Sequence, residues 1–441
     1  MSTNELYGVV HPQTREWSDG LMSNKMRELS AKPDTLPKWI VLDGDLDANW
    51  IESMNSVMDD NKILTLASNE RIKLLPHMRL LFEFRNLKFA TPATVSRAGI
   101  LFISDASGYQ WRAYFDSWLA SSKYPAERTT ELKALFEKYI PKSFDHIKKS
   151  FKYLIPVTEI SMIVSLCKLL ESFYLSIKTE IKNNEYMFVF CCVWCLGAGF
   201  GERRFFNGWW RDTWKTVKFP SGGSIFDYYV DFESNQLLEW KRMDTTDIAA
   251  KIDTSKRISS YTVPTSDTIA ISYIMKQFLS VKHSPMLIGA AGCGKTQITK
   301  GLLEELTAGD RSDYLSQTIN FNYYTDSSLL QTILESQLEK KSGNNFGPKG
   351  KFTLIYFIDD LNMPALDKYE TQNAIALIRQ FKDYNHCYER SKWTLKNVQK
   401  TLYVAAMNPT AGSFTINERL QRHFWLASVT FPETNSLTTI F

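Results

Sequence analysis

The sequence predicts an α/β protein that contains two related modules, each a parallel sheet covered by helices, with a small helical domain between them. Three observations support this prediction. Short apolar strands alternate with helical stretches after residue 263, a glycine-rich loop joins one of these strands to a helix, and landmarks of this region recur near residue 43. Strands that alternate with helices favour a parallel sheet whose two faces are both covered.

The glycine-rich loop is the segment Gly289–Thr296, which reads GAAGCGKT and matches the phosphate-binding pattern GxxxxGK[ST]. The apolar run Pro285–Ile288 precedes it, and the helical stretch Gln297–Leu306 follows it. A strand that passes through glycines into a helix directs several backbone N–H groups and a helix N-terminus at one point. This arrangement predicts a polyphosphate site.

Each residue type in this loop has a physical role. The glycines allow positive φ angles and a close approach of the backbone to a ligand. They are Gly289, Gly292 and Gly294. Lys295 is predicted to contact the β- and γ-phosphates, and the hydroxyl of Thr296 is predicted to bind Mg²⁺. The expected ligands are therefore ATP or ADP together with Mg²⁺.

Polar side chains follow two further strands of the same region. The apolar run Ile355–Ile358 leads into Asp359 and Asp360, and a carboxylate at such a strand end is where Mg²⁺ is held beside a phosphate loop. Asp359 is the predicted metal ligand. Asp360 stands where many ATPases carry a glutamate that orients the attacking water, and a misplacement of about 1 Å costs on the order of 100-fold in rate. Slow hydrolysis and binding without turnover both stay open. Asn408, after the strand Leu402–Ala406, is a candidate to contact the γ-phosphate or the water, and a plain Asn-Pro turn is the alternative.

Three arginines precede the last strand of a module. Arg419 and Arg422 do so in the second copy, and Arg97 has the matching place in the first. In a ring of such modules an arginine can reach the γ-phosphate of its neighbour, and an exposed ion pair is the alternative interpretation. In the first copy Gly44 stands where the water-orienting carboxylate belongs, while Asp43 remains to help hold Mg²⁺. We therefore expect any nucleotide there to be held without turnover.

The organisation of the chain follows from these patterns. We expect a partial α/β subdomain without its phosphate loop, a helical lid, a connector that leads into the next module, and a second α/β subdomain without its lid. Their predicted ranges are 1–108, 109–205, 206–262 and 263–441.

Within these domains, apolar runs predict strands and 3.6-residue spacing predicts helices. The predicted strands are Trp39–Leu42, Arg79–Phe89, Ile100–Ile103, Tyr228–Val230, Pro285–Ile288, Gln317–Phe321, Phe352–Ile358, Leu402–Ala406 and Phe424–Val429. The predicted helices are Trp50–Asn61, Glu159–Tyr174, Tyr186–Phe200, Gln297–Thr307, Asp326–Lys340 and Tyr369–Phe381, while Asn207–Gly223 is predicted to be a connector.

Composition excludes several classes of protein. The 441 residues carry a net charge of +4, close to balance, which argues against a dedicated nucleic-acid binder. Met1–Gly20 has no apolar signal-peptide core, and the apolar run Tyr186–Phe200 is short of the ~20 residues of a membrane span. The six cysteines offer no second pair at zinc spacing, so we interpret them as small buried side chains of a protein in a reducing compartment.

The first module also predicts how much of a longer protein this chain represents. Its landmarks match those of the second at a similar separation, and at that separation its phosphate loop falls before Met1. We expect the chain to be a piece of a longer protein, or the product of a truncated gene model.

Long motifs resemble one known family. In the first half they are TREWSDG from Thr14, WIESMN from Trp50, DDNK from Asp59 and ATPATVSRAG from Ala90. In the second half they are FDYYVD from Phe226, VPTSDT from Val263, the phosphate loop and FIDDLNMP from Phe357. Together they resemble the second and third AAA+ modules of a dynein heavy chain, of the axonemal, outer-arm-like kind, over nearly the whole chain.

The resemblance implies a ring of AAA+ modules in one chain. It implies that the third AAA+ module of the family, which is the second module of this chain, binds ATP and gates a main motor site. It also implies that Arg97 and Arg422 (or Arg419) complete neighbouring sites. Val263 and Pro264 would line the adenine pocket. The implied partners are the remaining modules, microtubules through a stalk that is absent here, and intermediate and light chains through an absent tail. The implied location is the cytoskeleton of the cytoplasm and of the ciliary or flagellar axoneme, with no nucleic-acid or membrane partner.

Two functions therefore stay open from the sequence: a part of a motor ATPase, and a regulatory module that binds nucleotide with little or no hydrolysis. A nucleic-acid-translocating ring ATPase is a third, suggested by the stretch Arg203–Arg211 with its aromatic and basic side chains. Aromatic residues in a domain connector are more often packing anchors.

Overall fold

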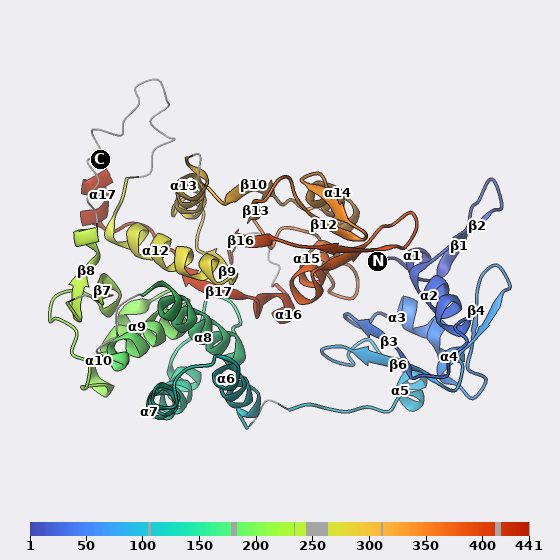
Figure 1. Ribbon diagram of the computed structural model, residues 1–441, viewed down its shortest axis with the longest axis horizontal. Helices are drawn as coiled ribbons and strands as arrows, with labels where there is room; N and C mark the ends of the chain where they lie inside the picture. The colour runs from blue at the N-terminus through green and yellow to red at the C-terminus, as the bar shows by residue number, and fades with distance from the viewer. Residues whose placement is uncertain are drawn as a thin grey trace, which may run out of the picture. The chain divides into compact units, whose positions relative to one another are not determined.

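The computed structural model describes residues 1–104, 107–177, 183–232, 234–243, 263–309, 312–410 and 416–440. The chain forms two compact units. One contains Met1–Ser104, Tyr324–Gly347 and Pro364–Gln399, and the other contains Asp105–Tyr323, Pro348–Met363 and Lys400–Phe441. The helices and strands of both units are labelled in Figure 1.

A five-stranded parallel sheet forms the centre of the larger unit, with strand order β10-β13-β16-β9-β17. β9, β13 and β17 are buried along nearly their whole length, as strands covered on both faces must be. Helix α13 contacts β10 and β16, and α12 contacts β9. The bounds are β9 Ser284–Ile288, β10 Tyr314–Asn320, β13 Thr353–Asp359, β16 Thr401–Met407, β17 Phe424–Ser428, α12 Ser266–Ser280, α13 Lys295–Thr307, α16 Glu418–Gln421 and α17 Thr434–Ile440. The five strands predicted for this sheet are confirmed.

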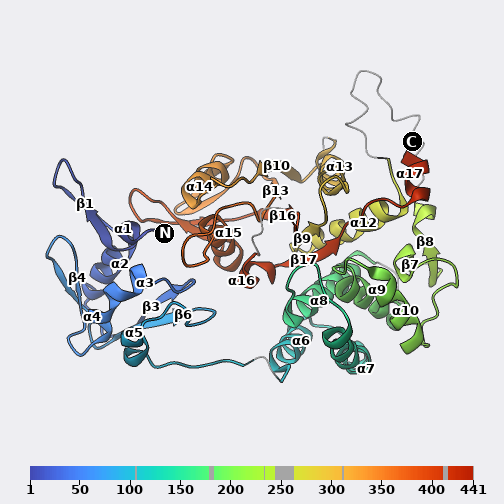
Figure 2. The same ribbon diagram turned by 180° about the vertical axis from the view of Figure 1, so that it is seen from behind.

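Five helices form the lid beside this sheet, and α8 packs against β17 (Figure 2). Thr158 and Asn183 cap the N-termini of α8 and α9 with their side chains. α9 is buried almost all round, which explains its long apolar run and the burial of its cysteines. The bounds are α6 Tyr109–Ser121, α7 Ala126–Ser150, α8 Glu159–Ser176, α9 Asn184–Gly197 and α10 Arg203–Thr213.

The segment predicted to be a connector begins with a helix. α10 crosses the boundary that we placed between residues 205 and 206, and its Phe206 and Trp210 are buried in the lid core. These two aromatic residues are four positions apart, so they lie on one face of the helix and anchor it. Beyond α10, a short hairpin pairs β7 Tyr228–Asp231 with β8 Gln236–Glu239, between the 3-10 turns Ile225–Asp227 and Trp240–Met243. The strand predicted at Tyr228 is confirmed. The rest of the predicted connector, 244–262, lies outside the described residues.

In the smaller unit, β3 Lys38–Asp43 and β6 Met78–Glu83 pair in parallel, as β13 and β16 do in the larger unit. Buried methionines and leucines under these strands form a separate core. The predicted helix at Trp50 is broken into α3 Ala48–Ile51, a 3-10 turn Glu52–Met54 and α4 Asn55–Met58. The remaining bounds are α1 Thr3–Tyr7, β1 Gly8–Val10, β2 Trp17–Asp19, α2 Leu21–Ser30, β4 Ile63–Thr65, β5 Arg71–Lys73 and α5 Pro92–Arg97.

The strand predicted at Ile100–Ile103 is wrong. These residues lie outside any strand, and Leu101, Phe102 and Ile103 are 91%, 88% and 78% exposed. In the second module the matching strand β17 is held by β9, and the described residues of the first module contain no equivalent of β9. Without a hydrogen-bonding partner, an apolar run cannot form a strand.

The smaller unit also contains α14 Ser327–Glu335 and α15 Asn373–Tyr384 from the second half of the sequence. Between and after them lies a four-stranded sheet of order β11-β12-β15-β14 that the sequence did not predict. Its strands are β11 Leu338–Ser342, β12 Asn345–Pro348, β14 His386–Tyr388 and β15 Leu395–Val398. We predicted a helix over Asp326–Lys340. The observed helix α14 ends at Glu335, and β11 begins at Leu338.

Candidate phosphate-binding site

The loop Gly289–Thr296 connects the buried end of β9 to the first turn of α13. Gly292 and Gly294 have φ angles of +80° and +96°, in the left-handed region where glycine is unstrained. A side chain at Gly289 would place its Cβ 2.1 Å from the backbone oxygen of Val429. The three glycines predicted from the pattern are therefore required by the backbone, two by dihedral angle and one by contact.

Lys295 lies inside the loop. Its side chain is buried, and its Nζ donates hydrogen bonds to the backbone oxygens of Gly289, at 2.9 Å, and Ala290, at 2.7 Å. Its Nζ also lies 3.7 Å from the sulfur of Cys293. A buried ammonium held by uncharged partners places a positive charge at the point where the pattern predicts phosphates. The residues present therefore fit an anionic ligand.

Thr296 and Asp359 meet at the end of the sheet. The Oγ1 of Thr296 donates a hydrogen bond of 2.7 Å to Oδ2 of Asp359. Parallel strands bring their carboxyl ends to one edge of a sheet, and β16 alone separates β13 from β9. The two predicted metal ligands therefore lie side by side, and a hydroxyl with a carboxylate is an oxygen donor set that suits Mg²⁺.

Asp360 follows Asp359 in a strained conformation. Its φ is +56°, its side chain is exposed, and its N–H donates to Oδ1 of Asp359 at 3.1 Å. Partial desolvation of this largely exposed side chain, and then the negative charge of Asp359, raises the pKa of the Asp360 carboxyl above its ordinary value. A left-handed non-glycine residue beside a strand end is a feature of functional sites.

Asn408 lies at the tip of β16, the strand next to β13. Its Oδ1 accepts hydrogen bonds from the N–H and hydroxyl of Thr410, at 3.1 and 2.8 Å. Its backbone oxygen accepts a 2.9 Å bond from Nδ2 of the buried Asn362. The side chain thus closes a turn in this structure, which is the alternative that the sequence left open.

The three predicted arginines lie in or directly after short helices. Arg97 ends α5, forms an ion pair with Asp59 and donates to the backbone oxygen of Ala93 at 2.8 Å. Arg419 lies within α16, and the exposed Arg422 directly after it donates from Nε to the backbone oxygen of Arg419 at 3.2 Å. Their role towards a neighbouring module stays a prediction.

Val263 and Pro264 are half-buried and lead directly into the capping box of α12, formed by Thr265 and Thr268. Their position before α12 follows from the sequence, and their contact with an adenine ring stays a prediction.

One feature of the site escaped sequence reasoning: the backbone that supports the loop from behind. Ser428, at the end of β17, donates from its N–H to Ala198 at 2.7 Å and from its hydroxyl to Phe200 at 2.5 Å, in both cases to a backbone oxygen of the lid. Val429 then donates to Ile288 at 2.7 Å, which places its own oxygen against Gly289. No side-chain pattern encodes these backbone contacts, so the sequence carried no signal for them.

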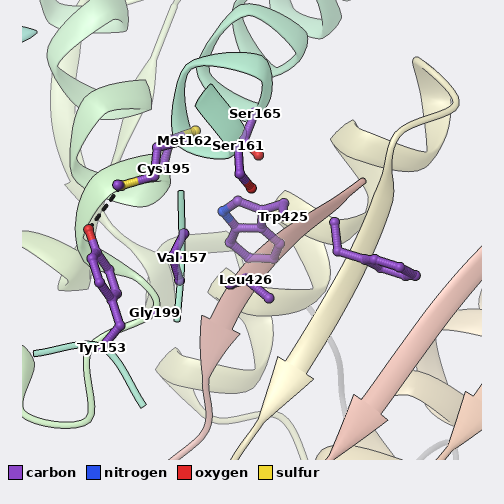
Figure 3. A pocket seen from close by; sticks show the side chains of 10 residues that line it. Tyr153, Val157, Ser161, Met162, Ser165, Cys195, Gly199, Trp425 and Leu426 are labelled. Carbon is purple, nitrogen blue, oxygen red and sulfur yellow. Dashed lines mark hydrogen bonds between the residues drawn. The ribbon is translucent and has the colours of Figure 1, made fainter. Parts of the chain in front are cut away.

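A small pocket lies where the lid meets β17 (Figure 3). Tyr153 reaches across it, and its hydroxyl contacts the sulfur of Met162 at 2.9 Å and donates to the backbone oxygen of Leu196 at 2.8 Å. None of the predicted site residues lines this pocket, so we assign it to lid packing.

In the smaller unit, Asp43 ends β3 as Asp359 ends β13. The sequence left Asp43 as a possible metal ligand. In the structure its carboxylate forms an ion pair of 2.9 Å with Arg379 of α15, and both side chains are buried. No group of three or more potential metal-binding side chains occurs among the residues that the structure describes.

Among the described helices, none combines the length and apolar character needed to cross a bilayer.

Three family profiles match the chain. They are described as an AAA domain of the dynein-related subfamily over residues 1–98, a dynein heavy chain AAA lid domain over 132–242, and a P-loop-containing dynein motor region over 250–432. The lid match ends beyond α10, in line with the longer lid seen in the structure.

Curated relatives match along the whole chain. The chain is 46% identical to the dynein alpha chain of the flagellar outer arm of Chlamydomonas reinhardtii, 45% identical to dynein axonemal heavy chain 9 of Homo sapiens, and 45% identical to a ciliary dynein beta chain of Heliocidaris crassispina. Each match covers 100% of this chain and 10% of the relative. The tandem α/β modules with a helical lid, the phosphate loop and these similarities together place the chain in the dynein heavy chain family, as a stretch that corresponds to a tenth of its relatives' length.

Proposed function

We propose that the second module binds ATP or ADP with Mg²⁺ at Gly289–Thr296, as one part of a dynein-type motor ATPase that couples nucleotide state to microtubule-based movement of cilia. The alternative is a regulatory module that binds nucleotide with little or no hydrolysis of its own. The observation that carries the proposal is the 2.7 Å hydrogen bond between Thr296 and Asp359 beside the buried Lys295.

The residues of the site would divide the work as follows. Lys295 would exchange its two loop carbonyls for phosphate oxygens, and the N–H groups of the loop and of the first turn of α13 would bind the remaining charge. Thr296 and Asp359 would hold Mg²⁺, which when bound neutralises charge on the phosphate oxygens. Asp360 would orient the water, and Arg97, Arg419 and Arg422 would act on neighbouring modules.

The regulatory alternative is favoured by the same strand end. Asp360 is shorter than glutamate, its backbone is left-handed, and its carboxyl has a raised pKa. The shorter side chain favours binding without turnover, because it reaches less far toward an attacking water. The raised pKa acts in the other direction, since it brings the carboxyl closer to the range in which a general base is effective. Hydrolysis by this module therefore stays open, while nucleotide binding does not depend on Asp360.

The wider setting comes from the relatives. Their names place them in flagellar outer arms, cilia and axonemes. For this chain we propose the axonemal cytoskeleton as location, the other modules of a longer heavy chain as direct partners, and microtubules and the intermediate and light chains as partners of segments outside it.

The test is nucleotide binding by this chain, measured by calorimetry or with a fluorescent ADP, in the presence and absence of Mg²⁺. Lys295→Ala is expected to lower affinity by about 100-fold or more, because a buried charge-assisted contact to phosphate is lost. Lys295→Gln keeps a donor for the loop carbonyls, so it separates loss of charge from collapse of the loop. Lys300→Ala is the matched control, because Lys300 is an exposed lysine on the same helix.

Equal affinities for the parent chain, Lys295→Gln and Lys300→Ala would refute a nucleotide site at this loop. Circular dichroism checks that each variant is folded.

A further inference from the structure

Two carboxylates that the internal repeat places in matching positions have different partners. Asp359 accepts a hydrogen bond from Thr296 of the phosphate loop. Asp43 instead faces Arg379, which comes from α15 in the second half of the sequence and lies in the same compact unit as Asp43. The position that is expected to bind a metal in one module is thus bound by an arginine in the other.

The contact between Arg379 and Asp43 is a closed one. Nη1 of Arg379 donates to both carboxylate oxygens of Asp43, at 3.0 and 2.9 Å, and Nη2 donates to its backbone oxygen at 3.0 Å. The side chains of Arg379 and Asp43 are 8% and 9% exposed. A guanidinium held by three hydrogen bonds to one residue is fixed in orientation as well as in position.

Two further groups complete the surroundings of this guanidinium. Asp383, one turn along α15, accepts from Nη1 at 3.2 Å and is 10% exposed. The hydroxyl of Tyr384 donates to Oδ2 of Asp43. Partial desolvation of this side chain, and then its bond to Asp43, raises the pKa of the Tyr384 hydroxyl to about 12. The guanidinium of Arg379 therefore contacts two buried carboxylates, and Lys382 also interacts with one of them, Asp383.

Such an arrangement leaves Asp43 unsuited to Mg²⁺. Both of its carboxylate oxygens already have donors, and a second cation would have to displace a buried guanidinium from its ion pair. Gly44 supports the same conclusion. An added Cβ would meet no atom within 4 Å, so there is room for a water-orienting side chain and none is present. The strand end of the first module thus lacks both halves of the catalytic pair.

We propose that Arg379 is the resident cation of the first module's strand-end carboxylate, in the place that corresponds to the metal position of the second module, and that Asp43 is an arginine-bound anchor for α15. Arg379 is then a positioning residue: it binds a helix of the second module to the strand end of the first. This inference concerns Asp43 and does not rest on nucleotide binding at Gly289–Thr296.

The segment that leads into α15 supports this anchoring role. Nε2 of Gln372, a buried residue just before the helix, donates to the oxygen of Pro364 at 2.7 Å and braces the turn. The hydroxyl of Tyr369 donates to Oδ1 of Asn49 at 3.1 Å. α15 therefore continues a surface that already contacts the first module.

The experiment replaces the cation. Arg379→Ala removes the guanidinium and leaves Asp43, Asp383 and the Tyr384 hydroxyl around the vacated space, a donor set that a small divalent ion accepts. The background is Asp359→Asn, which weakens metal binding at the second module. Thermal unfolding in EDTA and in millimolar Mg²⁺ or Mn²⁺ reports stabilisation, and Mn²⁺ paramagnetic resonance counts bound ions.

We expect the midpoint of thermal unfolding of the Asp359→Asn chain to be the same with and without divalent ions. Arg379→Ala should unfold at a lower temperature in EDTA, recover part of the loss with Mg²⁺ or Mn²⁺, and bind one additional Mn²⁺ that the further change Asp43→Asn removes. Recovery follows because an ion that binds only the folded state stabilises it by mass action.

Arg390→Ala is the matched control. It breaks another ion pair of the same unit, with Glu5, and should lower the midpoint without creating a divalent site. If Arg379→Ala does not fold in either condition, Arg379→Lys tests the same point: its ammonium should preserve divalent independence, because it keeps a cation at Asp43.

Binding of Mn²⁺ at Asp43 with Arg379 intact would overturn the proposal. An Arg379→Ala chain whose response to divalent ions is no larger than that of Arg390→Ala would also overturn it. So would an Arg379→Lys chain whose response is larger than that of Arg390→Ala.

Discussion

Oγ1 of Thr296 donates a 2.7 Å hydrogen bond to Oδ2 of Asp359, which links the first turn of α13 to the end of β13. The two residues are far apart in sequence: Thr296 follows β9 through the loop, Asp359 ends β13, and β16 separates these two strands in the sheet. Their contact assembles a hydroxyl and a carboxylate at one edge. In the matching position of the first module, the carboxylate is that of Asp43, and Arg379 binds it.

The first prediction concerns this hydrogen bond. Thr296→Val keeps the shape of the side chain and removes its hydroxyl, so we expect a loss of about 1 kcal/mol of stability. We also expect the Mg²⁺-dependent part of ADP affinity to fall by about tenfold, which corresponds to ~1.4 kcal/mol. Affinity is measured in EDTA and in Mg²⁺. Thr296→Ser keeps the hydroxyl and should retain the Mg²⁺ effect, and an equal Mg²⁺ effect in all three chains would contradict the assignment.

The second prediction uses two glycines as a matched pair. Gly289→Ala places a Cβ 2.1 Å from the oxygen of Val429, so β17 or the loop must move, and we expect about 1–3 kcal/mol of destabilisation. Gly208→Ala, at an open position inside α10, should stabilise by about 0.5–1 kcal/mol, because alanine loses less entropy in a helix. Urea unfolding measures both. A Gly289→Ala chain that is as stable as the parent, or more stable, would show that the contact at Gly289 relaxes freely.

Four strands of the main sheet, β9, β13, β16 and β17, could be predicted because each is a short apolar run. Asp359 and the phosphate loop mark two strand ends, and local pattern is enough to locate them. By contrast, β11 reads LEKKS and is largely exposed, so neither an apolar run nor an alternation marks it. Its strand character depends on pairing in a sheet, which no local pattern encodes.

The errors have a common physical origin in partners that lie far away in the sequence. Ile100–Ile103 has the composition of a strand and no neighbour among the described residues to pair with. Arg379 and Asp43 are separated by most of the chain, and each alone reads as an ordinary charged residue. Asn408 differs from these cases, because its side chain closes a turn onto Thr410, two residues away, which is the local alternative that the sequence had left open. The partners of Ile100–Ile103 and of Arg379 cannot be found from local sequence in this way.

The last prediction separates the two proposed functions at Asp360. Asp360→Glu lengthens the carboxylate by one methylene, and we expect ADP affinity to stay unchanged while phosphate release per bound ATP rises by about tenfold to 100-fold. The change should also cost about 1 kcal/mol of stability, because φ is +56° and aspartate tolerates this region better than glutamate does. Single-turnover phosphate release and urea unfolding measure the two effects.

The pH profile and a second variant complete this test. Because the pKa of Asp360 is raised, its neutral form persists to higher pH, so any activity that needs the carboxylate falls as pH decreases through that pKa. Asp360→Asn should remove this pH dependence together with the activity. A release rate that is equal in Asp360→Glu, Asp360→Asn and the parent chain would mean that no carboxylate at this position orients water, and the module would then act by binding nucleotide alone.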